Sequence, residues 1–397
     1  MADQGVNGGA GSSAIGKAKR VRMAPKLAYR NLFHDKLSLT VTLVGIVFSV
    51  VLVAVQCGLF LGAQRSIARV IDQTQGDIWI VPLGTKSFDD PSVLDGREKY
   101  AALALPEVER TEKLNIGFSR WRKPEGGSTT VLLVGSDWTT GGLRPWNIID
   151  GSVDEVTAPK GVAVDQSYFK DLGIKKIGDL AEINGQTVQV RAVTRGVRSF
   201  TTLPFVFTTL ARSQQMLGVN TKEGAYTLVR LRNDADVDSV KNTIAARFSD
   251  AEVLTTAEFR ERSINYWMFQ TGAGAGLIAG AILGVIVGVV IVAQTLYAST
   301  KDHLNEFATL RALGASSGYI IQVILLQALV SALIGYLLGI MLALGVVHAA
   351  DGTTLNVVMT PQLAMMLFAL TIGMCTLAAI SAIFKVTRID PASVFSR

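Results

Sequence analysis

The side chains that could do chemistry are scattered along this 397-residue chain. Its three histidines all lie outside residues 64–270, the long polar part of the chain, so that part lacks a histidine for acid–base catalysis or metal binding. Both cysteines, Cys57 and Cys375, fall in apolar runs, so no disulfide framework can form in the polar part. Serine, aspartate and glutamate occur without a nucleophile motif. We therefore expect a non-catalytic protein with no metal site.

Two short patterns resemble ligand sites but fail on their details. Gly11–Ala18 has the spacing of a phosphate-binding loop, but Ala18 stands where Ser or Thr must hold magnesium, and a Gly/Ser-rich tail replaces the strand. Asp89, Asp90 and Asp95 lack the spacing of a calcium loop, so we favour a solvated turn over a weak calcium site. We expect no cofactor in this chain and no ATP bound by it.

Four uncharged apolar runs are each long enough to cross a membrane, which takes about 20 residues at ~1.5 Å each. A charge at the centre of such a run would cost ~3 kcal/mol on insertion scales, and the runs contain none. A buried core helix is the alternative for a single run, but four runs of this length favour a membrane protein. The runs are Leu39–Ala63, Gly272–Tyr297, Ile320–Val347 and Leu363–Phe384.

The basic residues predict the orientation of these segments. Residues 64–270 hold 26 basic and 26 acidic residues, so the net charge of +6 comes from the flanks of the apolar runs, which also argues against nucleic-acid binding. The short loop Ala349–Pro361 has no Lys or Arg. By the positive-inside rule both termini are cytoplasmic and residues 64–270 lie outside. The flanking basic residues are Lys17, Lys19, Arg20, Arg22, Lys26, Arg30, Lys36, Lys301, Arg311, Lys385, Arg388 and Arg397.

Residues 64–270 have the length and patterns of a folded α+β domain. Asn184-Gly185 predicts a hairpin within Ala181–Val193, and Gly173 ends a helix over Gln166–Leu172. The fold class is thus an α-helical membrane protein with four transmembrane helices and an α+β extracytoplasmic domain inserted between helices 1 and 2. Further strands are expected at Gly76–Val81, Thr129–Val134, Gly161–Val164, Ala225–Leu231 and Val253–Leu254, and helices at Val237–Phe248 and Thr256–Trp267.

These patterns divide the chain into nine segments. Residues 1–36 form a cytoplasmic tail, in which Met23–Lys36 suits either an interfacial amphipathic helix or a plain basic flank. The cytoplasmic coupling loop is 299–318, the short external loop is 349–361, and 386–397 form the second cytoplasmic tail. The transmembrane helices are expected at 37–63, 271–298, 319–348 and 362–385, and the periplasmic domain at 64–270.

Glycines and glutamines are the notable residues within the spans. Five glycines spaced four apart form one helix stripe, where another backbone could approach closely, within the subunit or across a dimer. Chance is the alternative explanation, and Gly58/Gly62 and Gly335/Gly339 repeat the spacing once each. We favour packing over a transport pathway for Gln56, Gln294, Gln322 and Gln327. The helix-packing stripe is Gly272, Gly276, Gly280, Gly284 and Gly288.

The loop between the second and third spans predicts a short amphipathic helix that could lie in a groove of another protein. Its apolar residues recur at helical spacing, and Glu306 and Arg311 frame the apolar face. The candidate coupling residues are Leu304, Glu306, Phe307, Leu310, Arg311 and Gly314.

This loop closely resembles the coupling segment of MacB/FtsX-type ABC transporter permeases, and the resemblance covers nearly the whole chain. Leu27–Leu32 is similar to the family's entry helix, Asp171–Ile174 with Ile177–Asp179 to its outer-domain signature, and Asp390–Ala392 to its C-terminal end. Gln56–Gly62 and Asp77–Trp79 look most like the DevC subfamily.

The resemblance implies a permease subunit of an ABC-type export complex in the bacterial inner membrane. Such permeases work as dimers with a separate ABC ATPase that binds the ATP, and the coupling helix passes ATPase-driven motion to the periplasmic domain. The DevC-type pattern implies a membrane-fusion protein and an outer-membrane channel as further partners. A lipid, a glycolipid or another amphiphile is the expected substrate. The alternative is an FtsX-like regulatory scaffold that activates a periplasmic partner.

Overall fold

The computed structural model describes residues 32–34, 36–90, 92–138, 140–302, 317–350 and 356–387. The coupling loop's centre and most of the expected interfacial helix lie outside these residues. The chain divides into two compact units. The membrane unit comprises the described parts of Met1–Gly58, Leu277–His348 and Val358–Arg397, and the outer unit comprises Leu59–Gly276 with the described part of Ala349–Val357.

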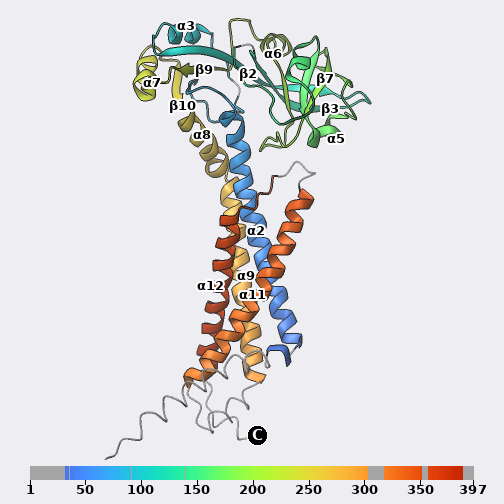
Figure 1. Ribbon diagram of the computed structural model, residues 1–397, viewed down its shortest axis with the longest axis vertical. Coiled ribbons are helices and arrows are strands. Elements are labelled where there is room, and N and C mark those ends of the chain that lie inside the picture. The colour runs from blue at the N-terminus through green and yellow to red at the C-terminus, as the bar shows by residue number, and fades with distance from the viewer. Residues whose placement is uncertain are drawn as a thin grey trace, which may run out of the picture. The chain divides into compact units, whose positions relative to one another are not determined.

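Four long helices confirm the expected membrane-spanning elements (Figure 1). They are α2 (Lys36–Asp72), α9 (Ala273–Asp302), α11 (Ser317–Ala350) and α12 (Pro361–Thr387), and each contains a stretch apolar and long enough to cross a membrane. The end of the first of these helices differs from the sequence expectation. α2 does not end with the apolar run at Ala63 but continues to Asp72, so its 37 residues extend over ~55 Å.

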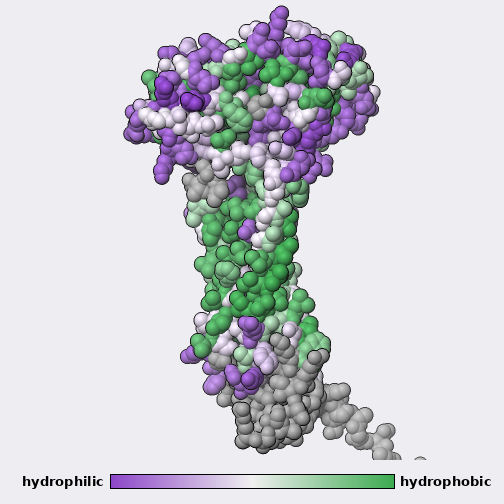
Figure 2. Space-filling model, turned by 180° about the vertical axis from the view of Figure 1, so that it is seen from behind, coloured by the Kyte–Doolittle hydropathy of each residue, from purple (hydrophilic) through white to green (hydrophobic). Residues whose placement is uncertain are grey.

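The membrane unit has a small buried centre and a broad apolar surface. The centre includes Ile46, Val50, Ala328 and Cys375, from three of the four helices. Large apolar side chains such as Leu283 point outward and are exposed. On the face seen in Figure 2, the middle of this unit is a broad hydrophobic band, as expected for helices whose solvent is lipid hydrocarbon.

The outer unit is built on one mixed sheet in the order β10-β1-β9-β2-β3-β8-β5-β7-β4, with β6 pairing both β2 and β7. The longest strand, β2, pairs with β9 along its first half and with β3 along its second. The strands are β1 (Ile78–Pro82), β2 (Val108–Arg122), β3 (Ser128–Ser136), β4 (Ile148–Gly151), β5 (Gly161–Asp165), β6 (Leu180–Ile183), β7 (Gln186–Thr194), β8 (Phe205–Thr209), β9 (Tyr226–Leu231) and β10 (Ala251–Thr255).

Six of these strands close on themselves. The pairs β2–β3, β3–β8, β8–β5, β5–β7, β7–β6 and β6–β2 form a small barrel. Its interior is filled by side chains that include Trp121, Leu133, Val164 and Val190, all fully buried. The Trp121 indole donates to the carbonyl of Leu172, which satisfies its polar edge inside an apolar core.

The remaining strands form a sheet that is covered on both faces. Ile78 and Ile80 of β1 pack on one face with α3 and α7, while Trp79 and Val81 pack on the other with α8. The helices of this unit are α3 (Arg97–Leu103), α4 (Val153–Thr157), α5 (Phe169–Leu172), α6 (Leu210–Leu217), α7 (Val237–Ala245) and α8 (Thr256–Asn265), followed by a π-helical turn over Tyr266–Gln270 and with a 3-10 turn at Gln166–Tyr168.

The structure confirms the local signals and adds three strands that they missed, β2, β4 and β8. The Asn184-Gly185 turn joins β6 to β7 with both residues at positive φ, and Gly173 ends α5 at φ +67°. No sequence signal identified β2, because charged residues interrupt its apolar alternation at Glu109, Arg110 and Glu112. These charges turn out to carry a polar network described below.

Candidate functional site

The predicted coupling residues lie outside the part of the chain that the structure describes. They are Leu304, Glu306, Phe307, Leu310, Arg311 and Gly314, and their role stays a prediction. The structure does describe two other regions that bear on the predicted role. One is the packing between the membrane helices, and the other is the attachment of α2 to the outer domain.

Three glycines of the expected stripe form a close contact of α9 with α2, here called the glycine seam. A Cβ at Gly284 would lie 3.0 Å from Val53 Cγ2, and one at Gly288 would lie 2.4 Å from both Ser49 Oγ and Met374 Sδ of α12. At Gly280 the nearest atom is Gln56 Nε2, at 2.6 Å. The absence of side chains therefore sets how closely these helices approach.

The other two glycines of the stripe do not join this seam. Gly272 precedes α9 with φ +80°, and a Cβ added to it or to Gly276 would meet no other described atom within 4 Å. The packing inside the described chain thus uses Gly280, Gly284 and Gly288, and the packing role expected for Gly272 and Gly276 stays a prediction. Gly335 and Gly339 of α11 face Ile46 and Val50 of α2 in the same close manner.

A hydrogen bond fixes the register of the glycine seam. The Ser49 hydroxyl donates to the carbonyl of Gly284 over 2.7 Å, and Ser49 is buried. Between α11 and α12, the Tyr336 hydroxyl donates to the carbonyl of Ala364 over 2.9 Å. Among the four glutamines, Gln327 is buried and Gln56 is half-buried at Gly280, whereas Gln294 and Gln322 are exposed.

In the outer unit, the last part of α2 makes polar contacts with three other segments. The Asp72 carboxylate pairs with Arg260 of α8 at 3.2 Å, and Arg69 donates to the carbonyl of Gly196 at 2.8 Å. Asn356 donates to Ser66 Oγ over 3.0 Å, and a Cβ on Gly62 would lie 1.7 Å from the Asn356 carbonyl oxygen. Gly62 is therefore needed for this close approach of the backbone.

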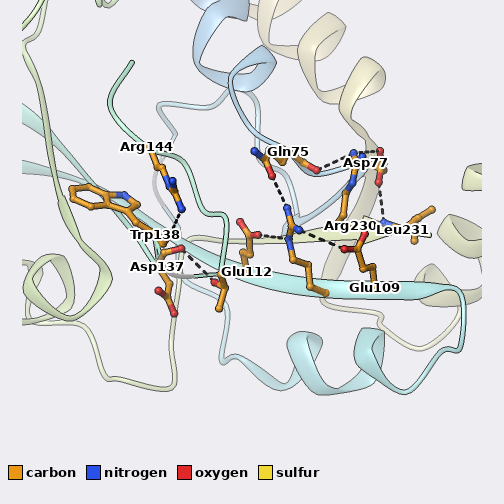
Figure 3. A network of polar contacts seen from close by, with 11 residues as sticks. Gln75, Asp77, Glu109, Glu112, Asp137, Trp138, Arg144, Arg230 and Leu231 are labelled. Carbon is orange, nitrogen blue, oxygen red and sulfur yellow. Dashed lines mark hydrogen bonds and ion pairs between the residues drawn. The ribbon is translucent and has the colours of Figure 1, made fainter. Parts of the chain in front are cut away.

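Polar side chains join the linker after α2 to the sheet (Figure 3). The Asp77 carboxylate accepts from Arg230 at 3.0 Å and from the backbone N–H of Leu231 at 2.8 Å. Its side chain thus takes the place of a backbone carbonyl as the partner of β9 just before β1 begins. Gln75 accepts from the guanidinium of Arg110 at 2.6 Å. The chain that leaves α2 is thus fixed to β9 and β2 within five residues of the end of the helix.

Arg110 extends the connection to a buried carboxylate. Its Nε donates to Glu112 Oε1 over 2.8 Å, and the Glu112 side chain is only 5% exposed. Burial raises the pKa of Glu112, and it outweighs the hydrogen bond and charge of Arg110, which lower that pKa. Gly141 lies beside this pair with φ +99°, and a Cβ added to it would lie 2.8 Å from Arg110 Nη2, so the position favours glycine.

The sequence contained a usable signal for this network. Arg110 and Glu112 are two apart, which places them on the same face of a strand, and Leu114 and Ile116 continue that face as buried residues. The apolar continuation showed that the face is internal. Charges at its beginning should then have been expected to pair.

The glycine seam predicts a sharp difference between two glycines of the membrane helices. Gly288→Leu should force α9 away from Ser49 and Met374, at a cost of about 1–3 kcal/mol or more for overpacking, whereas Gly373→Leu in α12, where a Cβ meets no described atom within 4 Å, should be tolerated. Thermal unfolding of the purified chain in mild detergent measures both. Equal unfolding temperatures for the two variants would show that the seam does not set the stability of the bundle.

Glu112 predicts a pH dependence whose sign follows from its raised pKa. The folded protein holds the Glu112 proton to higher pH than the unfolded chain does, so ionisation costs stability as pH rises through the raised pKa. The difference in unfolding temperature between Glu112→Gln and the native protein should therefore be more positive at pH 8 than at pH 4. Melting curves at the two pH values test this, with Glu155→Gln, an exposed carboxylate, as control. A relative loss of stability at pH 8 would contradict the assignment.

Two family models together cover most of the chain. The model described as "MacB-like periplasmic core domain" matches residues 39–247, and the one described as "FtsX-like permease C-terminal" matches residues 278–391. No curated protein sequence matches this chain.

Solved structures with a similar outer domain include three at low sequence identity. The periplasmic region of MacB from Actinobacillus actinomycetemcomitans is 11% identical, with 48% of this chain and 94% of that one covered and a TM-score of 0.37. The extracellular domain of the noncanonic ABC-type transporter YknZ from Gram-positive bacteria is 13% identical (45% and 99% covered, TM-score 0.34). A domain of a putative permease from Porphyromonas gingivalis is also 13% identical (45% and 89%, 0.31). Because the first family model alone spans more than half of the chain, this protein belongs to the MacB/FtsX-like permease family.

Proposed function

We propose that this chain is the permease subunit of an ABC-type export complex in the bacterial inner membrane. Its family normally works with an ABC ATPase, which would bind and hydrolyse the ATP. Both termini and the 299–318 loop would face the cytoplasm, where Leu304, Phe307 and Leu310 would dock on that ATPase. The chain itself would need no cofactor.

The observation that carries the proposal is the continuity of α2. The helix runs unbroken from Lys36 to Asp72, although its residues up to Gly58 belong to the membrane unit and those from Leu59 to the outer unit. A helix resists compression and bending over this length, so a shift imposed at one end is felt at the other. The ion pair of Asp72 and the bonds of Gln75 and Asp77 would pass that shift to the sheet.

The finer features of the complex follow from the same family resemblance. We expect a homodimer of this chain, in which Gly272 and Gly276 are available to a second copy because the described chain leaves them uncovered. The DevC-like segments Gln56–Gly62 and Asp77–Trp79 favour a membrane-fusion protein and an outer-membrane channel as partners. The exported molecule would be a lipid, a glycolipid or another amphiphile.

A substitution in the coupling loop tests the proposal. Leu310→Asp removes an apolar docking side chain, and it should leave insertion intact while the chain no longer alters the rate of ATP hydrolysis by its partner ATPase. The matched control is Leu180→Asp, because Leu180 is an exposed leucine of the outer domain. ATPase rates of the co-purified complex in lipid would show at least a several-fold loss of coupling only for Leu310→Asp. Unchanged coupling would contradict the proposed role of the loop.

Co-purification separates export from the regulatory alternative. Capture of a membrane-fusion protein together with the ATPase would support export. Capture of a periplasmic hydrolase in its place would instead support a scaffold that activates a periplasmic partner.

A further inference from the structure

The chain leaves the outer unit through an interrupted helix, whereas it enters through the unbroken α2. α8 passes into the π-helical turn Tyr266–Gln270, and Thr271 and Gly272 then separate this turn from α9. The Thr271 N–H donates to the Tyr266 carbonyl at 3.1 Å as the turn ends, and the Gly276 N–H donates to the Gly272 carbonyl at 3.0 Å as α9 begins. The helical hydrogen bonds thus stop and start again at this point.

Glycines give the interruption its shape. Gly272 has φ +80°, and a Cβ on it would meet no described atom within 4 Å, so the backbone conformation alone calls for glycine there. A Cβ on Gly274 would lie 2.6 Å from the Met268 carbonyl oxygen, so that position needs glycine for a close approach. Gly274 and Gly276 also weaken the first turn of α9, because glycine is a poorer helix former than alanine.

α8, which precedes the interruption, is fixed to the outer unit. A capping box between Thr255 and Glu258 fixes its beginning. Three ion pairs then join it to other elements of the unit. They are Lys241–Glu258 at 2.8 Å, Arg260–Asp72 at 3.2 Å and Arg262–Glu252 at 2.5 Å.

The first part of the π-helical turn is fixed as well. The Trp267 indole N–H donates to Asp89 Oδ1 over 2.9 Å, and its ring meets Phe200 edge to face with centroids 5.4 Å apart. Met268 is fully buried in a cluster with Ile67 of α2. The outer unit therefore holds the chain as far as Met268.

The next four residues, Phe269 to Gly272, are held far less. All four are exposed, and the Phe269 side chain is 54% exposed. The Thr271 hydroxyl donates to the Trp267 carbonyl over 2.5 Å and accepts from the Ala273 N–H at 3.4 Å. In the described part of the chain, the hydrogen bonds of these residues thus lead only to near neighbours in the sequence.

The two ends of the outer unit therefore differ in stiffness. A shift of α2 reaches the sheet, and it also reaches α8 through the Asp72–Arg260 pair and the packing of Met268 on Ile67. A change in the direction of α9 instead meets a segment whose helical hydrogen bonds are interrupted. Rotation about a few backbone bonds can absorb the change there.

We propose that Phe269–Gly272 is a hinge at which α9 changes its direction relative to α8, while the outer unit follows α2. The inference rests on the proposed function, since the partner ATPase would supply the motion. It makes α2 the transmitting connection and frees α9 to move without distorting the outer unit.

Distances between paired spin labels in the full chain in lipid nanodiscs test the hinge. Labels at Glu261 and Ile282 lie on either side of it, and labels at Val44 and Arg65 lie within α2 as the matched control. Both pairs are 21 residues apart, and all four positions are exposed. Cys57→Ala with Cys375→Ala removes the native thiols. We expect a narrow distribution near ~32 Å for the α2 pair and one at least twice as wide for the pair across the hinge.

Glycine variants identify the cause of the width. Gly272→Ala disfavours the positive φ and should narrow the distribution of the Glu261/Ile282 pair to that of the α2 pair. Gly272→Asn should keep it wide, because asparagine tolerates positive φ. Gly276→Ala makes the same chemical change without a positive φ and should also keep it wide. Equal widths for the two pairs in the unsubstituted chain, or an unchanged width in Gly272→Ala, would overturn the inference.

The complex with the partner ATPase tests the role of the hinge in the cycle. ATP should shift the mean Glu261/Ile282 distance by about one helical turn, ~5 Å, and leave the Val44/Arg65 distance unchanged. A shift only in the α2 pair would overturn the inference. The widths in the isolated chain do not involve the ATPase, so failure of the hinge is distinguishable from failure of Leu310→Asp to alter coupling, which would contradict the proposed function.

Discussion

α2 keeps helical backbone hydrogen bonds from Lys36 to Asp72, and this continuity constrains the rest of the chain. Up to Ala63 its side chains must suit hydrocarbon, and from Gln64 onward they must suit water and a folded domain. Small residues on this one helix, Ser49 and Gly62, accept close neighbours, while Arg69 and Asp72 form polar contacts.

The contacts just after α2 are all polar side chains that pair with groups of the sheet. Asp77 replaces a missing strand partner by accepting from a backbone N–H, and Arg110 joins Gln75 to a buried carboxylate. Glu112 is the buried charge of this network, and removing its partner Arg110 would leave that carboxylate unpaired inside the domain at a high cost in free energy, so the pair holds its geometry strictly. That strictness suits a joint that passes on displacement, because a loose joint would absorb it.

The sequence predicted the membrane architecture well because a lipid solvent imposes a simple rule, about 20 uncharged apolar residues for each crossing. It also predicted turns such as Asn184-Gly185, whose backbone needs a positive φ. It missed β2 and the Arg110–Glu112 pair, because a segment with buried, paired charges looks the same in the sequence as a segment exposed to solvent. Spacing alone could not show which of the five glycines of the stripe contact α2 within one chain, because that depends on where α9 begins and on which helix lies beside it.

Insertions into α2 test most directly whether this helix carries motion to the outer domain. Four alanines placed between Ala63 and Gln64 lengthen the helix by about one turn and leave it continuous, whereas four glycines interrupt it. Hydrogen exchange of the outer domain, measured with and without ATP in the complex with the ATPase, would report the transmitted change. If α2 carries the motion, the ATP-dependent difference survives the alanine insertion at least in part and disappears with the glycine insertion. The same ATP-dependent difference in both would contradict it.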